Sequence, residues 1–515
     1  MRTTLIKLSL FKFVFLFVFF SCADSKPDQV PEEKADFCSQ IHSVDSATLS
    51  KELEPVADSM RTKTGIYVLE DGDGAMVTRA WLAEHAEKTI DIQYFIFSVD
   101  NVGLIACDYL VRAADRGVKV RILVDDIMVE AGIHEILTMD SHENIEIRVY
   151  NPGVNLGKNL VQKLGKFAFD FVKANQRMHN KTFIVDDKVV ITGGRNIADE
   201  YFDYDHEYNF RDRDVLMLGK VTGQMHASFE EFWNHSLSVP AAKLVSEPEE
   251  KFDSKNRFER LHQYACNPEN FWPQVREKIQ SLPTAFKHIR ESGELVWLNE
   301  VHFVSDIPGK SEKTDGLSGG VTTSALMNLI NNAKHSVTIQ SPYLITTKLG
   351  QDLFAAAVKR GVKVRIQTNS LASTDNLEAF SGYQRCRKDL LEAGVEIYEF
   401  RPDAKCRFDI MTGALQKKVN YTPVFGLHAK SMVIDDSITV IGTFNLDPRS
   451  ANLNTECFAI IPSVKVAKRV LQEIEVELKP ENSWHTTLDW NPDAEAGIKK
   501  QLKASSRKAV PTGIL

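Results

Sequence analysis

The chain has 515 residues, of which 43% are hydrophobic and 26% charged, and its formal net charge is −8. This composition is typical of soluble globular proteins, and the length predicts two or three domains. A dedicated nucleic-acid-binding protein usually carries a basic excess that meets the phosphate backbone. The acidic balance disfavours that class, so we expect no nucleic acid among the partners.

The first 22 residues differ from the rest of the chain. A basic segment, an apolar run and a cysteine follow one another: Arg2, Lys7 and Lys12, then residues 13–20, then Ser21-Cys22. The apolar run is far shorter than the roughly 20 residues that span a bilayer, so residues 1–22 are predicted to be a signal peptide. Ser21-Cys22 is also similar to a lipoprotein processing site, which would leave a lipid anchor on Cys22. An uncleaved signal anchor is the alternative, and each of these interpretations predicts an exported, membrane-associated protein of the bacterial cell envelope.

Polar, proline-containing residues 23–40 are predicted to be a tether. Beyond them the chain repeats itself. Four landmarks recur in the same order at offsets of 244 to 250 residues: RGVKVRI at 116–122 and 360–366, IDIQ at 90–93 and VTIQ at 337–340, EI at 146–147 and 396–397, and His179 and His428. The repeat predicts two copies of one domain, an N-terminal lobe over residues 41–240 and a C-terminal lobe over residues 296–515, with residues 241–295 connecting them.

Each copy alternates between strand and helix patterns. In chain order, the expected elements of both copies are strands at 90–97 and 337–345, helices at 104–116 and 349–360, and strands at 118–124 and 362–368. A glycine follows each of these helices, as is usual at a helix end. The fold class is therefore α/β, with a mixed β-sheet flanked by helices in each lobe.

The second half of each copy carries the same reactive trio. HNKTFIVDD occupies residues 179–187 and HAKSMVIDD occupies residues 428–436. Residues i and i+2 of a strand share a face, so His179 and Lys181 project together, as do His428 and Lys430. Asp186 and Asp435 have the opposite parity, and we expect them to have a structural role in a turn or a salt bridge.

The segments that follow, residues 187–196 and 436–445, are predicted to pair with the trios as hairpins. A turn over Asp187-Lys188 would put His179 opposite Asn196, and the equivalent turn in the second copy would put His428 opposite Asn445. Each lobe would then contribute a His, a Lys and an Asn to a small pocket.

Two such pockets facing each other suit phosphodiester cleavage. The Lys and Asn side chains can hold phosphoryl oxygens while one imidazole attacks phosphorus and the other protonates the leaving alcohol. The seven cysteines form no CxxC pair, and the carboxylates show no clear metal-ligand spacing. The sequence therefore predicts no metal and no cofactor, although an exported chain can form one or two disulfides.

The motif His179-Lys181-Asp186, repeated as His428-Lys430-Asp435, resembles the HxKxxxxD motif of the phospholipase D superfamily. The resemblance implies two pseudo-symmetric lobes with one active site at their interface, and a phosphohistidine intermediate. It also implies a downstream acid that orients each His, and Asp214 and Glu456 lie at suitable positions. By the same resemblance His179 is the nucleophile and His428 the acid, and the reverse assignment stays open.

Within the superfamily, residues 64–460 are most similar to the bacterial cardiolipin synthases of the C type. The stretches that carry this resemblance are IDIQYFIF, LVDDIMVEAGIHEIL, RMHNKTFIVD, GGRNIADEYF, TNSLASTD and FNLDPRS. It implies a phosphatidyltransferase acting at a phospholipid membrane surface on phosphatidylglycerol, with phosphatidylethanolamine as a candidate second substrate. An accessory protein is left open. Phe380 stands where a His is expected, which suggests a changed acceptor pocket.

Other interpretations remain open on sequence alone. A phospholipase D would pass the same intermediate to water, and a secreted nuclease would use the same motifs on DNA. A catalytically dead protein would bind lipid without cleaving it. Residues 158–174 have apolar residues at helical spacing opposite four lysines. They predict either an interfacial helix beside the site or an ordinary amphipathic helix on the core.

Overall fold

The computed structural model of the chain describes residues 48–126, 133–153, 176–244, 254–271, 276, 284–310, 319–410 and 423–507. The predicted signal peptide, the tether and the helix at 158–174 lie outside these residues. Among the described helices, none combines the length and the apolar character that crossing a membrane requires.

The first lobe is built on a nine-stranded mixed sheet of order β10-β1-β8-β6-β5-β2-β3-β4-β9. Strands β2, β3 and β4 are parallel and the other pairings are antiparallel. The strands are β1 (Thr64–Leu69), β2 (Thr89–Tyr94), β3 (Lys119–Asp125), β4 (Ile145–Tyr150), β5 (Thr182–Val185), β6 (Val189–Gly193), β8 (Asp214–Gly219), β9 (Ser238–Pro240) and β10 (Val296–Leu298).

The second lobe repeats this order in an eight-stranded sheet, β11-β18-β17-β16-β12-β13-β14-β19. Its strands are β11 (His302–Ser305), β12 (Ser336–Gln340), β13 (Lys363–Asn369), β14 (Glu396–Phe400), β16 (Ser431–Ile434), β17 (Ile438–Gly442), β18 (Cys457–Pro462) and β19 (Ser483–Thr486). Across the sheet these strands take the places of β1, β8, β6, β5, β2, β3, β4 and β9 of the first lobe, in that order. The predicted duplication therefore extends to the order of the strands in the sheet.

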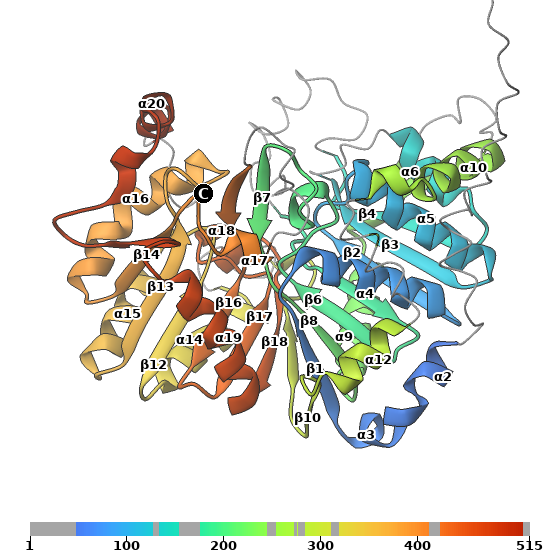
Figure 1. Cartoon of the computed structure of the whole chain (residues 1–515), viewed down its shortest axis with the longest axis horizontal. Helices are drawn as coiled ribbons and strands as arrows, with labels where there is room; N and C mark the ends of the chain where they lie inside the picture. Colours follow the sequence, from blue (N-terminus) through green and yellow to red (C-terminus); the bar gives the residue numbers. More distant parts are fainter. Residues whose placement is uncertain are drawn as a thin grey trace, which may run out of the picture.

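Helices flank both sheets (Figure 1). In the first lobe they are α2 (Leu49–Leu53), α3 (Ala57–Thr62), α4 (Gly72–His85), α5 (Asn101–Asp115), α6 (Ile133–Asp140), α9 (Thr222–Trp233), α10 (Ser254–Ala265) and α12 (Ala285–Glu291), with short 3₁₀ turns η1 (Glu54–Val56), η3 (Asp199–Tyr201), η4 (Ala241–Leu244) and η5 (Pro268–Asn270). In the second lobe they are α14 (Val321–Asn332), α15 (Lys348–Lys359), α16 (Leu377–Glu392), α17 (Arg407–Ile410), α18 (Pro448–Asn452), α19 (Val464–Glu477), α20 (Ile498–Arg507) and η7 (Pro492–Glu495).

The predicted boundary between the lobes needs correction. The described part of segment 241–295 packs onto the first lobe, because Phe271, Phe286 and Ile289 are buried in that lobe's core. Strand β10, which the prediction placed in the second lobe, pairs with β1 at the edge of the first sheet. The repeat spacing did not reveal this, because the second sheet has no counterpart of β10.

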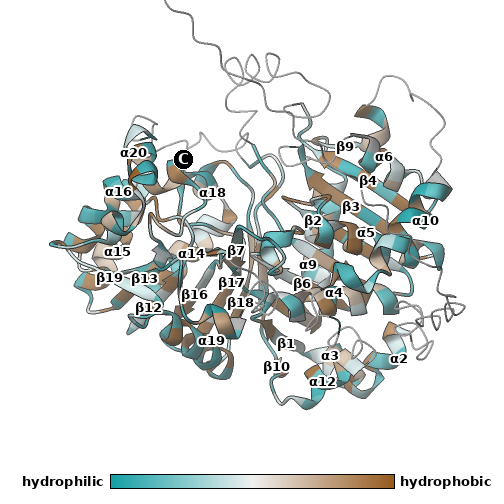
Figure 2. Ribbon diagram, turned by 45° about the horizontal axis from the view of Figure 1, so that its top comes forward, coloured by the Kyte–Doolittle hydropathy of each residue, from teal (hydrophilic) through white to brown (hydrophobic). Residues whose placement is uncertain are grey.

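The lobes meet along a shared hydrophobic core. Ile184, Val190 and Phe229 of the first lobe and Val433 and Ile441 of the second are buried in one cluster. In Figure 2 the hydrophobic residues, in brown, follow the strands, whereas the hydrophilic ones lie on outward faces of helices such as α10 and α16. A two-stranded parallel sheet, β7 (Tyr208–Arg211) with β15 (Val424–Leu427), adds one strand from each lobe.

The two central hairpins turn one residue earlier than predicted. Val185 pairs with Val189, and Ile434 pairs with Ile438. The amides of Lys188 and Ser437 donate to the carbonyls of Val185 and Ile434, so the turns centre on Asp186-Asp187 and Asp435-Asp436. All four aspartates have φ between 51° and 55°. Two positive φ values define a type I′ turn, whose twist matches that of the strands and which Asp tolerates. The predicted register, with His179 opposite Asn196 and His428 opposite Asn445, is therefore off by one.

Candidate active site

Each trio is bound to the opposite lobe through its backbone. The His179 amide donates to the Thr455 carbonyl at 3.0 Å, and the amides of His428 and Ala429 donate to the Arg211 carbonyl at 2.8 and 2.9 Å. Both imidazoles are buried, with 7% of His179 and 6% of His428 exposed. The residues just before β5 and β16 therefore lie at the interface between the lobes.

The carboxylates that contact the imidazoles come from the opposite lobes. His179 Nδ1 lies 2.8 Å from Glu456 Oε2, and His428 Nδ1 lies 2.6 Å from Asp212 Oδ2. A hydrogen bond from Nδ1–H to a carboxylate fixes the tautomer and leaves Nε2 of each ring available for chemistry. The two halves are thus joined by two crossed His–carboxylate contacts.

Asp214 does not contact either imidazole, contrary to the prediction. Its carboxylate accepts a hydrogen bond from Arg79 at 2.8 Å and another from the Arg195 amide at 3.2 Å. Asp214 already belongs to β8, where it pairs with Gly193 inside the first lobe. Asp212 precedes β8, directly after the inter-lobe strand β7, and sequence reasoning missed it.

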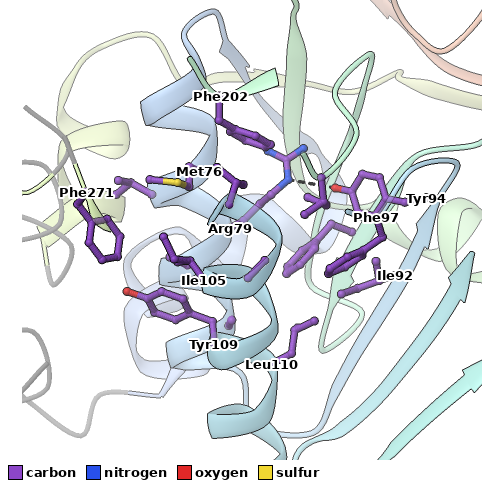
Figure 3. Close-up of a pocket in the computed structure, with 17 residues that line it drawn as sticks. Met76, Arg79, Ile92, Tyr94, Phe97, Ile105, Tyr109, Leu110, Phe202 and Phe271 are labelled. Atoms are coloured by element: carbon purple, nitrogen blue, oxygen red, sulfur yellow. Dashed lines mark hydrogen bonds between the residues drawn. The ribbon is translucent and has the colours of Figure 1, made fainter. Parts of the chain in front are cut away.

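Arg79 lies on α4 and lines an apolar cavity between α4, α5 and the first sheet (Figure 3). In the close-up its guanidinium points toward Tyr94, and the Nε–Oη distance is 3.0 Å. Because the same guanidinium donates to Asp214, this carboxylate belongs to the structure of the first lobe.

The two glycines of GGRN make room for the acids. A Cβ on Gly194 would collide with the Asp212 carboxylate, and one on Gly193 would collide with Asp214. The second lobe has Thr443 in place of Gly194, and its hydroxyl donates to Glu456 Oε2. Ser450 Oγ donates to Glu456 Oε1 at 2.7 Å. The acid partner of His179 is therefore held by two hydroxyls.

Lys181 and Lys430 are almost fully buried beside their own histidines. Lys181 Nζ donates to the His179 carbonyl at 2.9 Å and Lys430 Nζ to the His428 carbonyl at 2.6 Å. Burial lowers the pKa of Lys181 to about 8 and that of Lys430 to about 7, and repulsion from Lys181 contributes to the second value. Two cations from different lobes therefore share one buried site.

Burial also lowers the pKa of both imidazoles. The pKa of His179 falls to about 4, with Lys181 acting in the same direction and Glu456 against it. That of His428 falls to about 3, lowered further by Lys430 and opposed by Asp212. Both rings are neutral at pH 7. Despite burial, the contacts with His179 and His428, and then the nearby lysines, hold the pKa values of Glu456 and Asp212 below their usual range.

Each asparagine is connected to the histidine of the other lobe. Asn196 hydrogen-bonds Tyr201, whose ring packs edge-on against His428 at 5.0 Å between centroids. The Asn196 Oδ1 atom accepts from the Ile96 amide at 3.0 Å. Asn445 is connected through its backbone: its N–H donates to Ser450 Oγ, and that hydroxyl in turn donates to Glu456, the acid partner of His179.

The side-chain oxygen of Asn445 is buried and has no hydrogen-bond partner among the described residues. A buried polar atom without a partner is unusual and costs free energy, so such atoms are frequent where a ligand binds. Asn445 is therefore a candidate contact for a substrate.

Asp186 and Asp435 lie in the hairpin turns and accept hydrogen bonds from backbone amides. Asp186 accepts from the amides of residues 87–89 at 2.7 to 2.9 Å, and Asp435 from those of residues 334–336 at 2.7 to 3.1 Å. These contacts fasten each hairpin to the start of the neighbouring strand, β2 or β12. The structure thus places both aspartates in turns rather than in ion pairs.

Phe380 lies in the core of the second lobe. Its side chain is 3% exposed and packs edge-on against Tyr383 with centroids 5.5 Å apart. The first turn of α16 directs it into that core, and a changed acceptor pocket at Phe380 stays a prediction.

Comparison with known proteins places this geometry in a family. Residues 82–233 and 326–477 each match the family described as "Cardiolipin synthase, PLD-like domain". The chain belongs to this phospholipase D-like family. It is a phospholipase D-family phosphatidyltransferase and a homologue of the cardiolipin synthases, which confirms the predicted family and enzyme class.

The similar proteins cover most of the chain. Cardiolipin synthase C of Escherichia coli (strain K12) is 33% identical over 86% of this chain and 90% of its own length. An uncharacterized protein of Helicobacter pylori (strain ATCC 700392 / 26695) is 34% identical over 82% of this chain and 80% of its own. The crystal structure of phosphatidylserine synthase from Haemophilus influenzae matches 90% of this chain and all of that one, with a TM-score of 0.57 at 14% identity. This last match confirms the predicted α/β fold of two lobes.

Proposed function

We propose that the protein makes cardiolipin by moving a phosphatidyl group from one phospholipid to the hydroxyl of phosphatidylglycerol. The observation that carries the proposal is the pair of crossed contacts, His179 with Glu456 and His428 with Asp212. Each histidine depends on an acid of the other lobe, so the two trios act as one site. The similarity to cardiolipin synthase C supports a phospholipid substrate.

In the first step Nε2 of neutral His179 attacks phosphorus, a P–N bond forms, and the P–O bond to the headgroup alcohol breaks. The electron pair of that bond stays on the alcohol oxygen, which takes a proton from the imidazolium of His428. The low pKa of His179, about 4, keeps this ring nucleophilic. A bound phosphodiester brings negative charge beside His428, and negative charge raises the pKa of an imidazole, so His428 can carry the proton when substrate is bound.

In the second step the acceptor hydroxyl gives its proton back to His428, attacks phosphorus and displaces His179. Lys181 and Lys430 hold the non-bridging oxygens while negative charge builds, and Asn196 and Asn445 are the amides that we assign to the same task. If water replaces the lipid alcohol, the same steps give phosphatidic acid. The protein would then be a phospholipase D, which is the second candidate function.

We further propose that the protein is exported and works at the membrane surface of the cell envelope. The N-terminal segment, including Cys22, supports this location. Cys266 is disulfide-bonded, and disulfides persist mainly in oxidising compartments. N-terminal sequencing and membrane fractionation of the protein from its cell test the location; an intact residue 1 in a cytosolic fraction would contradict it.

The enzymatic proposal is tested by giving the purified protein phosphatidylglycerol, with and without phosphatidylethanolamine, and identifying the products by mass spectrometry. We expect cardiolipin. Phosphatidic acid without cardiolipin would instead establish the hydrolase, and DNA cleavage without lipid turnover would establish the nuclease.

A further inference from the structure

The segment that leads to Glu456 is held by a buried ion pair of the second lobe. The pair is Asp306 and Lys310, whose charged atoms lie 2.8 Å apart, with 2% of Asp306 and 3% of Lys310 exposed. Lys310 Nζ also donates to the Ser450 carbonyl at 2.8 Å and to the Asn454 carbonyl at 3.0 Å. One ammonium therefore fastens this segment at two points.

The other member of the pair, Asp306, holds Glu456 itself. Asp306 directly follows β11, which pairs with β18 as far as Ser305 and Cys457, so Asp306 comes to lie beside Glu456. Its backbone N–H donates to the Glu456 carbonyl at 2.9 Å, and its Oδ2 accepts from the Glu456 amide at 3.1 Å. Ser450, whose carbonyl binds Lys310, donates its hydroxyl to the Glu456 carboxylate. The ion pair thus fixes the backbone of Glu456 and that of the hydroxyl residue that holds its side chain.

The start of α14 packs tightly against the same pair. Thr322 donates its amide to Asp306 Oδ1 at 3.0 Å and its hydroxyl to Asp306 Oδ2 at 2.7 Å. Gly320 precedes this helix, and a Cβ there would lie 2.2 Å from Asp306 Oδ1 and 2.5 Å from Lys310 Cε. Both distances are far below van der Waals contact, so the pair can occupy this position only because residue 320 is a glycine.

The first lobe has an acid at the same place in its sheet. Strands β1 and β11 correspond in the two sheets, and Glu70 follows β1 as Asp306 follows β11. The Glu70 carboxylate accepts from Arg211 and Arg213, the two residues that flank Asp212. In each lobe, therefore, the acid after this strand supports the chain around a carboxylate that bonds a histidine.

We propose that Lys310 and Asp306 are positioning residues for the nucleophile: they hold Glu456 so that its Oε2 stays in hydrogen-bond contact with Nδ1 of His179. This inference rests on the proposed function, in which His179 forms the P–N bond. The geometry of a reactive group is set by the residues that support it, and a small misplacement of such a group can cost about 10²-fold in rate. Since both residues lie behind Glu456 and act through it, their loss should lower kcat and leave KM for the lipid unchanged.

The test is a double-variant cycle measured by release of the headgroup alcohol. Lys310→Met keeps the length of the side chain and removes the ammonium, and we expect kcat to fall at least about tenfold with KM within about twofold of wild type. In the Glu456→Gln protein the same substitution should lower kcat by less than about threefold, because a residue that acts only through Glu456 has little further effect once that carboxylate is gone. Circular dichroism and denaturant unfolding set a temperature at which all four proteins are folded.

A second variant and a control complete the test. Gly320→Ala displaces the pair without leaving a buried charge unpaired, so it replaces Lys310→Met in the cycle if that variant does not fold, and the same pattern is expected. Arg387 is a matched buried cation of the second lobe, 11% exposed and paired with Glu399 and Asp493. Arg387→Met should lower stability but keep kcat within about twofold of wild type.

An unchanged kcat in Lys310→Met would overturn the inference and leave the proposed function intact. A loss as large in the Glu456→Gln protein as in the wild type would do the same, as would a rise in KM alone. A comparable loss of kcat in Arg387→Met would show that destabilisation explains the effect and would also overturn it. If the wild type releases no alcohol, the proposed function fails, and the inference fails with it.

Discussion

The chemistry of the site depends on single contacts between residues far apart in the chain. His428 and Asp212 are separated by 216 positions, and His179 and Glu456 by 277. Each carboxylate fixes the ring that contacts it and stabilises the imidazolium or phosphohistidine that forms during the reaction. Their loss should therefore affect the rate of the chemical step much more than the fold.

Replacing Asp212 by Asn or Glu456 by Gln keeps the size of the side chain and removes its charge. We expect kcat to fall by about 10² to 10⁴, because a neutral amide can stabilise the wrong tautomer and not the imidazolium. Release of the headgroup alcohol measures the rate, and circular dichroism checks the fold. A loss of less than about threefold in both variants would contradict the role of these acids.

The buried lysines set the alkaline limit of activity. Their ammoniums are charged below the pKa values of about 8 for Lys181 and about 7 for Lys430. Since the charged forms hold the phosphoryl oxygens, kcat/KM should fall as the pH rises through 7 to 8, and not near the ordinary value of about 10.4 for Lys. Lys430→Arg keeps its charge at alkaline pH. This variant should therefore move the fall of kcat/KM to higher pH, whatever its effect on the maximal kcat/KM. A profile that stays flat to pH 10 would contradict the assignment.

At the scale of the element, the hairpins β5-β6 and β16-β17 are fastened by the aspartates of their type I′ turns. Asp435 accepts three backbone N–H groups of residues 334–336, and these bonds lower its pKa although burial opposes them. A carboxylate whose pKa is lowered by folding stabilises the protein above its unfolded value, near 3.9, and that contribution is lost as the pH falls through the folded pKa.

Asp435→Ala leaves three amides without their acceptor and should lower the free energy of unfolding by about 1–3 kcal/mol. Asp186→Ala should have a similar effect through residues 87–89. Denaturant unfolding at pH 7 measures both. Asp436→Gly is the control, since glycine adopts the positive φ of that turn position without strain. Equal stability of Asp435→Ala and wild type would show that the turn does not need the carboxylate.

At the scale of the whole molecule, a buried polar network crosses the interface between the lobes. Arg211 donates to Glu477 at 2.6 Å, and Arg213 donates to Gln340 at 2.5 Å and to Ser431 at 2.9 Å. Both arginines also contact Glu70. They flank Asp212, so the network that joins the lobes also positions the acid of His428.

Arg211→Ala would leave Glu477 buried without its cation. Removing one partner of a buried pair costs about 3–5 kcal/mol, so the midpoint of unfolding should fall sharply. The double variant Arg211→Met with Glu477→Met should recover much of that loss, because no unpaired charge stays buried. Denaturant unfolding of both variants checks this, and a double variant no more stable than Arg211→Ala would contradict the explanation.

Sequence reasoning predicted the features that depend on local pattern. The repeated RGVKVRI and the two trios predicted two lobes, and the strand and helix patterns predicted mixed sheets flanked by helices. It missed Asp212 because the sequence does not show that β7 runs between the lobes. That path places Asp212, and not Asp214 two residues later, beside His428. It also misplaced the turns by one residue, because an Asp-Asp pair at positive φ is less common than a turn with glycine. Contacts between the lobes cannot be read from a repeat, since each copy carries the same pattern.

The central claim is that both trios form a single site, and the activities of His179→Ala and His428→Ala test it most directly. Both variants are assayed for release of headgroup alcohol from phospholipid, under conditions in which product formation by the wild type is linear with time. Since residues that act as a unit are individually indispensable, each variant should lose roughly a thousandfold or more of the wild-type rate. If each lobe instead carried a complete site of its own, each variant would keep about half of that rate, and the account would be wrong.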